Sequence, residues 1–202
     1  MENVLIVEDD NALRAQVRFA LEEYYNVFEA GDREEAIECL EKENIGIVIL
    51  DLGLPPHENT PDEGIKILQY ILENLTAKVI ILTGQKTEGI AMDAIKEGAF
   101  DYILKPVNME KILFSIERAI LFRDAEEKLE KRGVKMISFN VEIGQGLQPV
   151  REEAEKNFVL KVLRDTNFNI YKAAKLLNVK RESIYYFMKK FGFKREEENG
   201  ND

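Results

Sequence analysis

The first 122 residues alternate between short apolar runs and longer segments in which apolar positions recur at helical spacing. The apolar runs are rich in β-branched residues, which is typical of buried strands. They lie at Val4–Val7, Val27–Ala30, Ile45–Leu50, Val79–Leu82 and Tyr102–Leu104. Short apolar strands that alternate with amphipathic helices indicate a parallel sheet covered on both faces. We therefore predict an α/β fold with a five-stranded, parallel, doubly wound sheet.

After residue 150 the pattern changes to three amphipathic segments separated by short turns. The second segment starts near Asn169 and carries the small residues Ala173 and Ala174, which suit a close helix crossing. The third segment follows a turn at Asn178–Lys180 and has a basic start. A short helix, a three-residue turn and a second, basic helix are typical of a helix-turn-helix. The sequence therefore predicts a small all-α domain at this end.

These patterns divide the chain into four segments. We assign residues 1–122 to the α/β domain and residues 151–195 to the helix-turn-helix domain. Residues 123–150 form a linker: charges at three- and four-residue spacing continue the last α/β-domain helix as far as Gly133, and a short extended segment follows at 134–143. Residues 196–202 are predicted to be a disordered tail.

The charge is unevenly divided between the two domains. Residues 1–122 contain 24 acidic and 11 basic residues, a balance of −13, whereas residues 151–195 contain 5 acidic and 12 basic residues, a balance of +7. The net charge of −10 for the whole chain therefore does not exclude binding to nucleic acid. Charge alone leaves open whether either surplus is more than a solvated surface.

Polar residues follow the apolar runs where four of the predicted strands end: Glu8 and Asp9, Asp51, Thr83, and Lys105. In a parallel sheet these ends meet at one edge, where ligands of such folds bind. Carboxylates can hold a divalent cation, and a carboxylate can also accept a phosphoryl group. A metal, an ammonium and a hydroxyl together can stabilise the charge of phosphoryl transfer. This set of residues therefore predicts a phosphoryl-transfer site.

Four motifs closely resemble the receiver domains of two-component response regulators. They are VLIVEDD at 4–10, VILDLGLP at 48–55, VIILTG at 79–84 and GAFDYILKP at 98–106. The resemblance covers about 120 residues and implies a flavodoxin-like sheet that takes a phosphoryl group on Asp51 from a histidine kinase. It also implies a Mg²⁺ site formed by Asp9, by Asp51, by Glu8 through a metal-bound water, and by the backbone carbonyl of Gly53.

The same resemblance assigns the switch residues of the domain. Thr83 would donate a hydrogen bond to the phosphoryl group, and Lys105 would pair with it, held by a cis peptide bond before Pro106. Tyr102 matches the aromatic residue whose inward rotation accompanies the movement of Thr83. These residues would convert phosphorylation into a change of surface.

Residues 167–193, NFNIYKAAKLLNVKRESIYYFMKKFGF, resemble the Fis-type DNA-binding domain. The resemblance implies a homodimer that binds a pseudo-palindromic site on double-stranded DNA. Arg181 is expected to contact a base edge, and Lys189 and Lys190 to approach phosphates. The full set of expected DNA-binding residues is Lys180, Arg181, Ser183, Tyr185, Tyr186, Lys189 and Lys190.

Activators with both of these domains usually carry a central ATPase, but no GxxxxGK[ST] motif lies between residues 122 and 151. The chain would therefore be a compact two-domain regulator or a shortened activator. A phosphohydrolase with Asp51 as nucleophile is disfavoured, because the second acid usual two residues further on is replaced by Gly53. A receiver-controlled regulator that binds protein instead of DNA is the other alternative.

The function expected from the sequence is transcriptional regulation in which phosphorylation favours a dimer and so raises DNA affinity. The chain would not be an enzyme beyond its own phosphoryl transfer and dephosphorylation. No stretch reaches the roughly 18 consecutive apolar residues that a membrane span needs. We therefore expect a cytoplasmic protein with no membrane partner.

Overall fold

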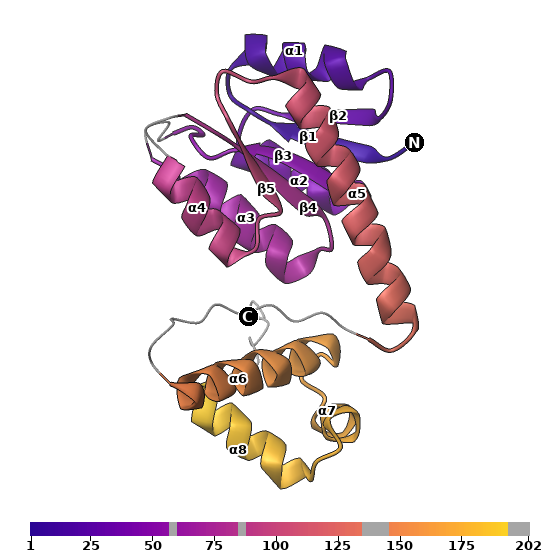
Figure 1. Ribbon diagram of the computed structural model, residues 1–202, viewed down its shortest axis with the longest axis vertical. Helices are drawn as coiled ribbons and strands as arrows, with labels where there is room; N and C mark the ends of the chain where they lie inside the picture. The colour runs from indigo at the N-terminus through magenta and orange to yellow at the C-terminus, as the bar shows by residue number, and fades with distance from the viewer. Residues whose placement is uncertain (57–59, 85–87, 135–145, 194–202) are drawn as a thin grey trace, which may run out of the picture. The chain divides into compact units, whose positions relative to one another are not determined.

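The structure, a computed structural model, describes residues 1–56, 60–84, 88–134 and 146–193. The chain divides into two compact units, residues 1–135 and residues 136–202. Figure 1 shows an α/β unit followed by a unit made of helices.

The first unit contains one five-stranded sheet in which every pairing is parallel. Its strands are β1 (Asn3–Val7), β2 (Asn26–Ala30), β3 (Ile47–Asp51), β4 (Lys78–Thr83) and β5 (Asp101–Leu104). The spatial order is β2-β1-β3-β4-β5, so the direction of winding reverses between β1 and β3. The predicted doubly wound sheet is confirmed, and the reversal marks the edge where such folds bind ligands.

Five helices cover the two faces of this sheet. They are α1 (Asn11–Leu21), α2 (Arg33–Lys42), α3 (Asp62–Asn74), α4 (Glu88–Glu97) and α5 (Met109–Lys131). Alternate residues of β1 enter separate cores: Leu5 packs in the core with α2, α3 and α4, whereas Ile6 packs in the core with α1 and α5. Burial on both faces explains why the strands read as continuous apolar runs.

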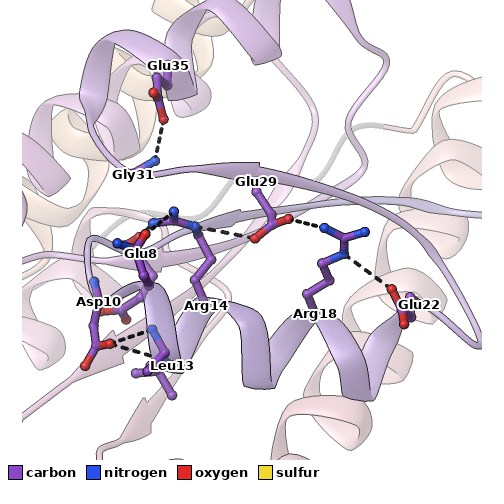
Figure 2. Close-up of polar contacts among 11 residues, drawn as sticks. Glu8, Asp10, Leu13, Arg14, Arg18, Glu22, Glu29, Gly31 and Glu35 are labelled. Atoms are coloured by element: carbon purple, nitrogen blue, oxygen red, sulfur yellow. Dashed lines mark hydrogen bonds and ion pairs between the residues drawn. The ribbon is translucent and has the colours of Figure 1, made fainter.

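Short polar side chains cap the N-termini of three of these helices. Asp10 caps α1 by accepting hydrogen bonds from the backbone N–H groups of Ala12 (2.8 Å) and Leu13 (3.2 Å), as Figure 2 shows for Leu13. Asp32 caps α2 and Asn108 caps α5 in the same way. These caps satisfy donors that have no partner inside the helix, and so fix where each helix leaves its strand.

Helix α5 extends well beyond the sheet and ends where the sequence predicts. It runs to Lys131, and Gly133 follows with a φ of 74°, a conformation that favours glycine. The predicted extended segment at 134–143 lies outside the described residues except for Val134, and the predicted disordered tail at 196–202 lies outside them entirely.

The second unit consists of α6 (Leu147–Asp165), α7 (Ile170–Leu177) and α8 (Arg181–Phe191). Its core is small and is formed by Val159, Val162, Leu163, Ala173, Ala174 and Ile184. Helix α6 begins at Leu147, inside the segment predicted as a linker. Pro149 lies in its first turn, where the missing N–H costs no hydrogen bond.

Two tight turns join the helices of the second unit. Asn178 adopts a left-handed conformation with a φ of 52° between α7 and α8, and the N–H of Val179 then bonds to the carbonyl of Ala174 at 3.0 Å. Asn169 caps α7 by accepting from the N–H of Lys172. The second unit therefore has the predicted helix-turn-helix architecture. Among the described residues, no helix combines the length and apolar character needed to cross a membrane.

Candidate functional site

The ends of β1 and β3 bring three carboxylates together. Asp51 is the last residue of β3, and Glu8 and Asp9 directly follow β1, its neighbour in the sheet. One oxygen from each of these side chains lies within 4.8 Å of the others. Glu8 and Asp51 are buried, with exposed fractions of 1% and 8%. The sequence-based expectation that these strand ends would converge is met in the geometry.

Lys105 lies among these acids from the end of β5. Its Nζ atom is 2.8 Å from Asp51 Oδ2 and 2.8 Å from Glu8 Oε2. The peptide bond between Lys105 and Pro106 is cis, and the N–H of Lys105 donates to the carbonyl of Thr83 at 2.7 Å. These features place the Lys105 ammonium within hydrogen-bond distance of two buried carboxylates.

The close packing of charges shifts the ionisation of this site. Burial, followed by the neighbouring Asp51 carboxylate, raises the pKa of Glu8 to about 7. Burial by itself would lower the pKa of Lys105, but its hydrogen bonds and ion pairs with Asp51 and Glu8 outweigh that effect and raise it above its ordinary value. Lys105 therefore remains a cation at neutral pH.

The carboxylates have the donor atoms that a hard divalent cation requires. Glu8 Oε2 is buried and accepts no hydrogen bond from the described residues, although the Lys105 ammonium lies beside it. Together with Asp9 and Asp51 it offers only oxygen ligands, which fits Mg²⁺. Gly53 donates its N–H to Asp51 Oδ1 at 3.3 Å, so the loop after β3 curls over the acid that it follows.

Two of the predicted switch residues, Thr83 and Tyr102, occupy neighbouring strands beside the acidic cluster. Thr83 ends β4, is 1% exposed and follows Leu82, the register partner of Asp51. Tyr102 lies on β5, half-buried, and packs against the core that includes α3 and α4. Thr83 is therefore close to Asp51 along the edge of the sheet, and Tyr102 lies on the adjoining strand.

Arg14 is a supporting residue that the sequence interpretation missed. From α1 it donates to the backbone carbonyl of Glu8 at 2.5 Å and pairs with Glu29 of β2 at 3.5 Å (Figure 2). It thereby holds the turn that carries the first two acids of the site. The available signal was a basic residue in the first turn of the helix that follows the acidic pair, together with an acidic residue on the next strand.

Gly64 is a second missed residue. It lies in the first turn of α3, and a Cβ atom there would be 2.5 Å from Leu52 Cα and 2.9 Å from the carbonyl oxygen of Asp51. Only a glycine lets this helix approach the backbone of Asp51 and Leu52 so closely. Sequence periodicity gives no signal for such a contact.

Helix α8 presents most of the predicted DNA-binding residues to solvent. Lys180, Arg181, Tyr185, Tyr186 and Lys189 are exposed, and Ser183 is half-buried. Tyr185 and Tyr186 are each 61% exposed, so neither is a core residue of the described unit.

Lys190 is also exposed, but its ammonium pairs with Glu155 of α6 at 2.8 Å. A phosphate contact by Lys190 would therefore compete with an ion pair inside the protein.

A doubly wound parallel sheet with carboxylates, a hydroxyl and a lysine at its strand ends, followed by a helix-turn-helix unit, defines a receiver protein with an output domain. Residues 4–117 match the response regulator receiver domain, and residues 150–191 match the Fis family of bacterial regulatory proteins. The chain belongs to the response regulator family. Only residues 118–149 separate the two matches, so no central ATPase lies between the two domains, as predicted.

Relatives and solved structures agree with this assignment. The regulatory protein VanR of Enterococcus faecium is 32% identical over 149 residues, which are 72% of this chain and 59% of VanR, so the chain spans less than two thirds of that relative. The receiver domain of a putative Luxo repressor protein from Vibrio parahaemolyticus is 27% identical, with a TM-score of 0.58 over 64% of this chain and 97% of that one.

A response regulator from Burkholderia pseudomallei matches over both units. It is 25% identical, with a TM-score of 0.52 over 92% of this chain and 97% of that one. Its structure contains a phosphorylated aspartic acid, a calcium ion and citrate.

Proposed function

We propose that this protein is a transcriptional regulator in which a histidine kinase phosphorylates Asp51 and thereby controls DNA binding by the second unit. The observation that carries the proposal is the arrangement around Asp51. Its carboxylate lies beside Glu8 and Asp9 and 2.8 Å from the ammonium of Lys105. That set combines a nucleophile, oxygen ligands for a cation and a counter-charge for phosphate.

In the proposed reaction, an Asp51 carboxylate oxygen attacks the phosphorus of a phosphohistidine on the kinase. A P–O bond to Asp51 forms while the P–N bond breaks, and the imidazole leaves with the bonding electron pair. Bound Mg²⁺ would neutralise charge on the phosphoryl oxygens, held by Asp9, Asp51 and the carbonyl of Gly53, with Glu8 acting through water. Lys105 and the hydroxyl of Thr83 would stabilise the remaining oxygens.

Phosphorylation must rearrange this site, because Lys105 already pairs with the carboxylate that would be modified. We infer that Lys105 moves to the phosphoryl group, that Thr83 donates to it and that Tyr102 follows Thr83 inward. The phosphorylated aspartic acid and calcium ion of the Burkholderia pseudomallei protein support this chemistry for a relative that matches along nearly the whole chain.

The second unit would supply the output. Its exposed residues Lys180, Arg181, Ser183, Tyr185, Tyr186 and Lys189 would meet DNA from α8, and Lys190 could join after release from Glu155. Two copies would bind a pseudo-palindromic site, since a two-fold symmetric dimer presents two recognition helices. A phosphorylation-favoured homodimer would bind more tightly because the second contact becomes intramolecular.

On this proposal the chain acts as a regulator and catalyses only its own phosphoryl transfer and dephosphorylation. Its kinase partner and its DNA would place it in the cytoplasm.

The test is selection of genomic DNA fragments by the purified protein, with and without beryllium fluoride and Mg²⁺ as a mimic of the phosphoryl group. We expect enrichment of a palindromic site, and tighter binding with the mimic. Asp51→Asn should abolish the increase but keep basal binding. Asp93→Asn is a matched control, because it makes the same charge change in the exposed Lys96 ion pair of α4.

Two results would count against the proposal. An Asp51→Asn variant that still responds to the mimic would show that Asp51 is not the acceptor. Absence of any enriched site, from wild-type protein shown to be folded, would favour a protein partner for the basic unit.

A further inference from the structure

One acidic residue lies on the outer surface of the helix proposed to enter DNA. Glu182 is the second residue of α8, is exposed, and its carboxylate makes no hydrogen bond or ion pair with another residue in the described ranges. The opposite side of α8 carries Ile184, which is completely buried. Tyr186 and Lys189, four and seven residues after Glu182, are also exposed and lie on the same side of the helix.

The surroundings of Glu182 are basic. A surface hollow between α7 and the start of α8 is lined by Tyr171, Ala174, Lys175, Val179, Lys180, Arg181 and Glu182. Lys175, Lys180 and Arg181 therefore share this hollow with one carboxylate. A negative residue among cations that face DNA is repelled by phosphate, so it lowers affinity for any duplex that does not offer it a donor.

The start of the second helix is the part of a helix-turn-helix that contacts base edges. Among major-groove base edges, the N4 amino group of cytosine is the donor that carboxylate side chains accept from. Arg181 precedes Glu182 directly and has the opposite preference, because it donates to guanine. Arg181 and Glu182 together therefore suit neighbouring positions of a site, with guanine at one and cytosine at the other.

We infer that Glu182 is a specificity-determining residue that accepts a hydrogen bond from the N4 amino group of a cytosine, one in each half-site. The inference rests on the proposed DNA-binding function and adds to it a base and the residue that reads it. An acid in the first turn of a helix also interacts favourably with the helix dipole. That interaction affects the stability of α8 and has no effect on base preference, so the two roles are separable by experiment.

The test is selection from a randomised duplex library by the full chain with beryllium fluoride and Mg²⁺. Wild-type protein should select cytosine at one position in each half-site. Glu182→Ala should lose that preference, which corresponds to about a 5- to 150-fold discrimination, and keep the rest of the site. Glu182→Gln should shift the preference toward adenine, because a glutamine pairs with adenine in the major groove.

Glu152→Gln in α6 provides the charge-matched control. Glu152 is exposed and accepts a hydrogen bond from Gln148 within the same helix. Its replacement by glutamine makes the same change in net charge as Glu182→Gln. This control should select the wild-type site. Equal helix content by circular dichroism would show that all the variants are folded.

The outcomes separate the inference from the proposed function. A Glu182→Ala variant that selects the same base at every position would overturn the role of Glu182 and leave DNA binding intact. Wild-type protein that selects no sequence would overturn both. If Glu152→Gln lost the cytosine preference as well, the effect would come from net charge, and base recognition by Glu182 would be refuted.

Discussion

The contact between α3 and the phosphoacceptor loop leads to a sharp prediction for Gly64→Ala. The added Cβ would lie 2.5 Å from Leu52 Cα and 2.9 Å from the carbonyl oxygen of Asp51. Carbon atoms in contact are ordinarily about 3.5–4.0 Å apart, so the first turn of α3 or the loop must move by about 1 Å. Both obstructing groups are backbone, so a change of rotamer cannot relieve the clash.

Two opposing effects set how much Gly64→Ala changes the free energy of unfolding. Overpacking at a tight contact costs about 1–3 kcal/mol of unfolding free energy. An alanine in a helix regains up to about 1 kcal/mol relative to glycine. We therefore expect Gly64→Ala to destabilise the receiver unit by about 1–2 kcal/mol, although the substitution improves helix propensity.

The matched control is Gly89→Ala. Gly89 lies in α4, where a Cβ would meet no atom within 4 Å. This change should be neutral or stabilise the unit by up to about 1 kcal/mol. Hydrogen exchange of the slowest amides of β1 and β3 measures the receiver unit separately from the helix-turn-helix unit.

A Gly64→Ala variant as stable as Gly89→Ala would refute the reasoning, because it would mean that α3 can move away from Asp51 at no cost. A destabilised variant that also binds beryllium fluoride more weakly would show that the contact positions Asp51 as well as the helix.

Two further predictions concern the helix-turn-helix unit, and the exchange of α7 and α8 amides measures both. Asn178 has a φ of 52°, so Asn178→Ala should cost about 1 kcal/mol, whereas Asn178→Gly should be nearly neutral; equal losses would contradict this account. Ile184 is completely buried in a small core, so Ile184→Ala should cost about 2–5 kcal/mol and Ile184→Val about 0.5–1.5 kcal/mol. Exchange in β1 should not change in any of these variants.

The sequence predicts the acidic site well because its geometry follows from topology alone. Once the strands are parallel, the residues at or directly after the ends of β1, β3, β4 and β5 must meet at one edge, whatever the details of packing. Glu8, Asp51 and Lys105 could therefore be placed together from the positions where apolar runs stop. The cis bond before Pro106 came from family resemblance, since spacing carries no information about it.

Contacts that depend on the distance between elements were not predictable in the same way. Arg14 supports the site through the carbonyl of Glu8, and Gly64 through a missing side chain, so neither contributes to an apolar or acidic pattern. On α8, helical spacing separates the buried side from the exposed side but does not say which cations are already paired. The ion pair of Lys190 with Glu155 required the position of α6.

The extension of α5 shows the same limit and bears on how a signal leaves the receiver. Charges at three- and four-residue spacing predict an exposed helix held by its own ion pairs, and the helix is present. Arg123, however, makes a bidentate ion pair with Glu2 before β1, and Glu126 pairs with Lys78 of β4 at 2.5 Å. Gly46 leaves the space that the Arg123 pair fills, since a Cβ there would clash with it. These ion pairs fix the extension, as far as Glu126, to the amino-terminal ends of the strands. A movement of α5 on phosphorylation would therefore move these ion pairs together with those strand ends.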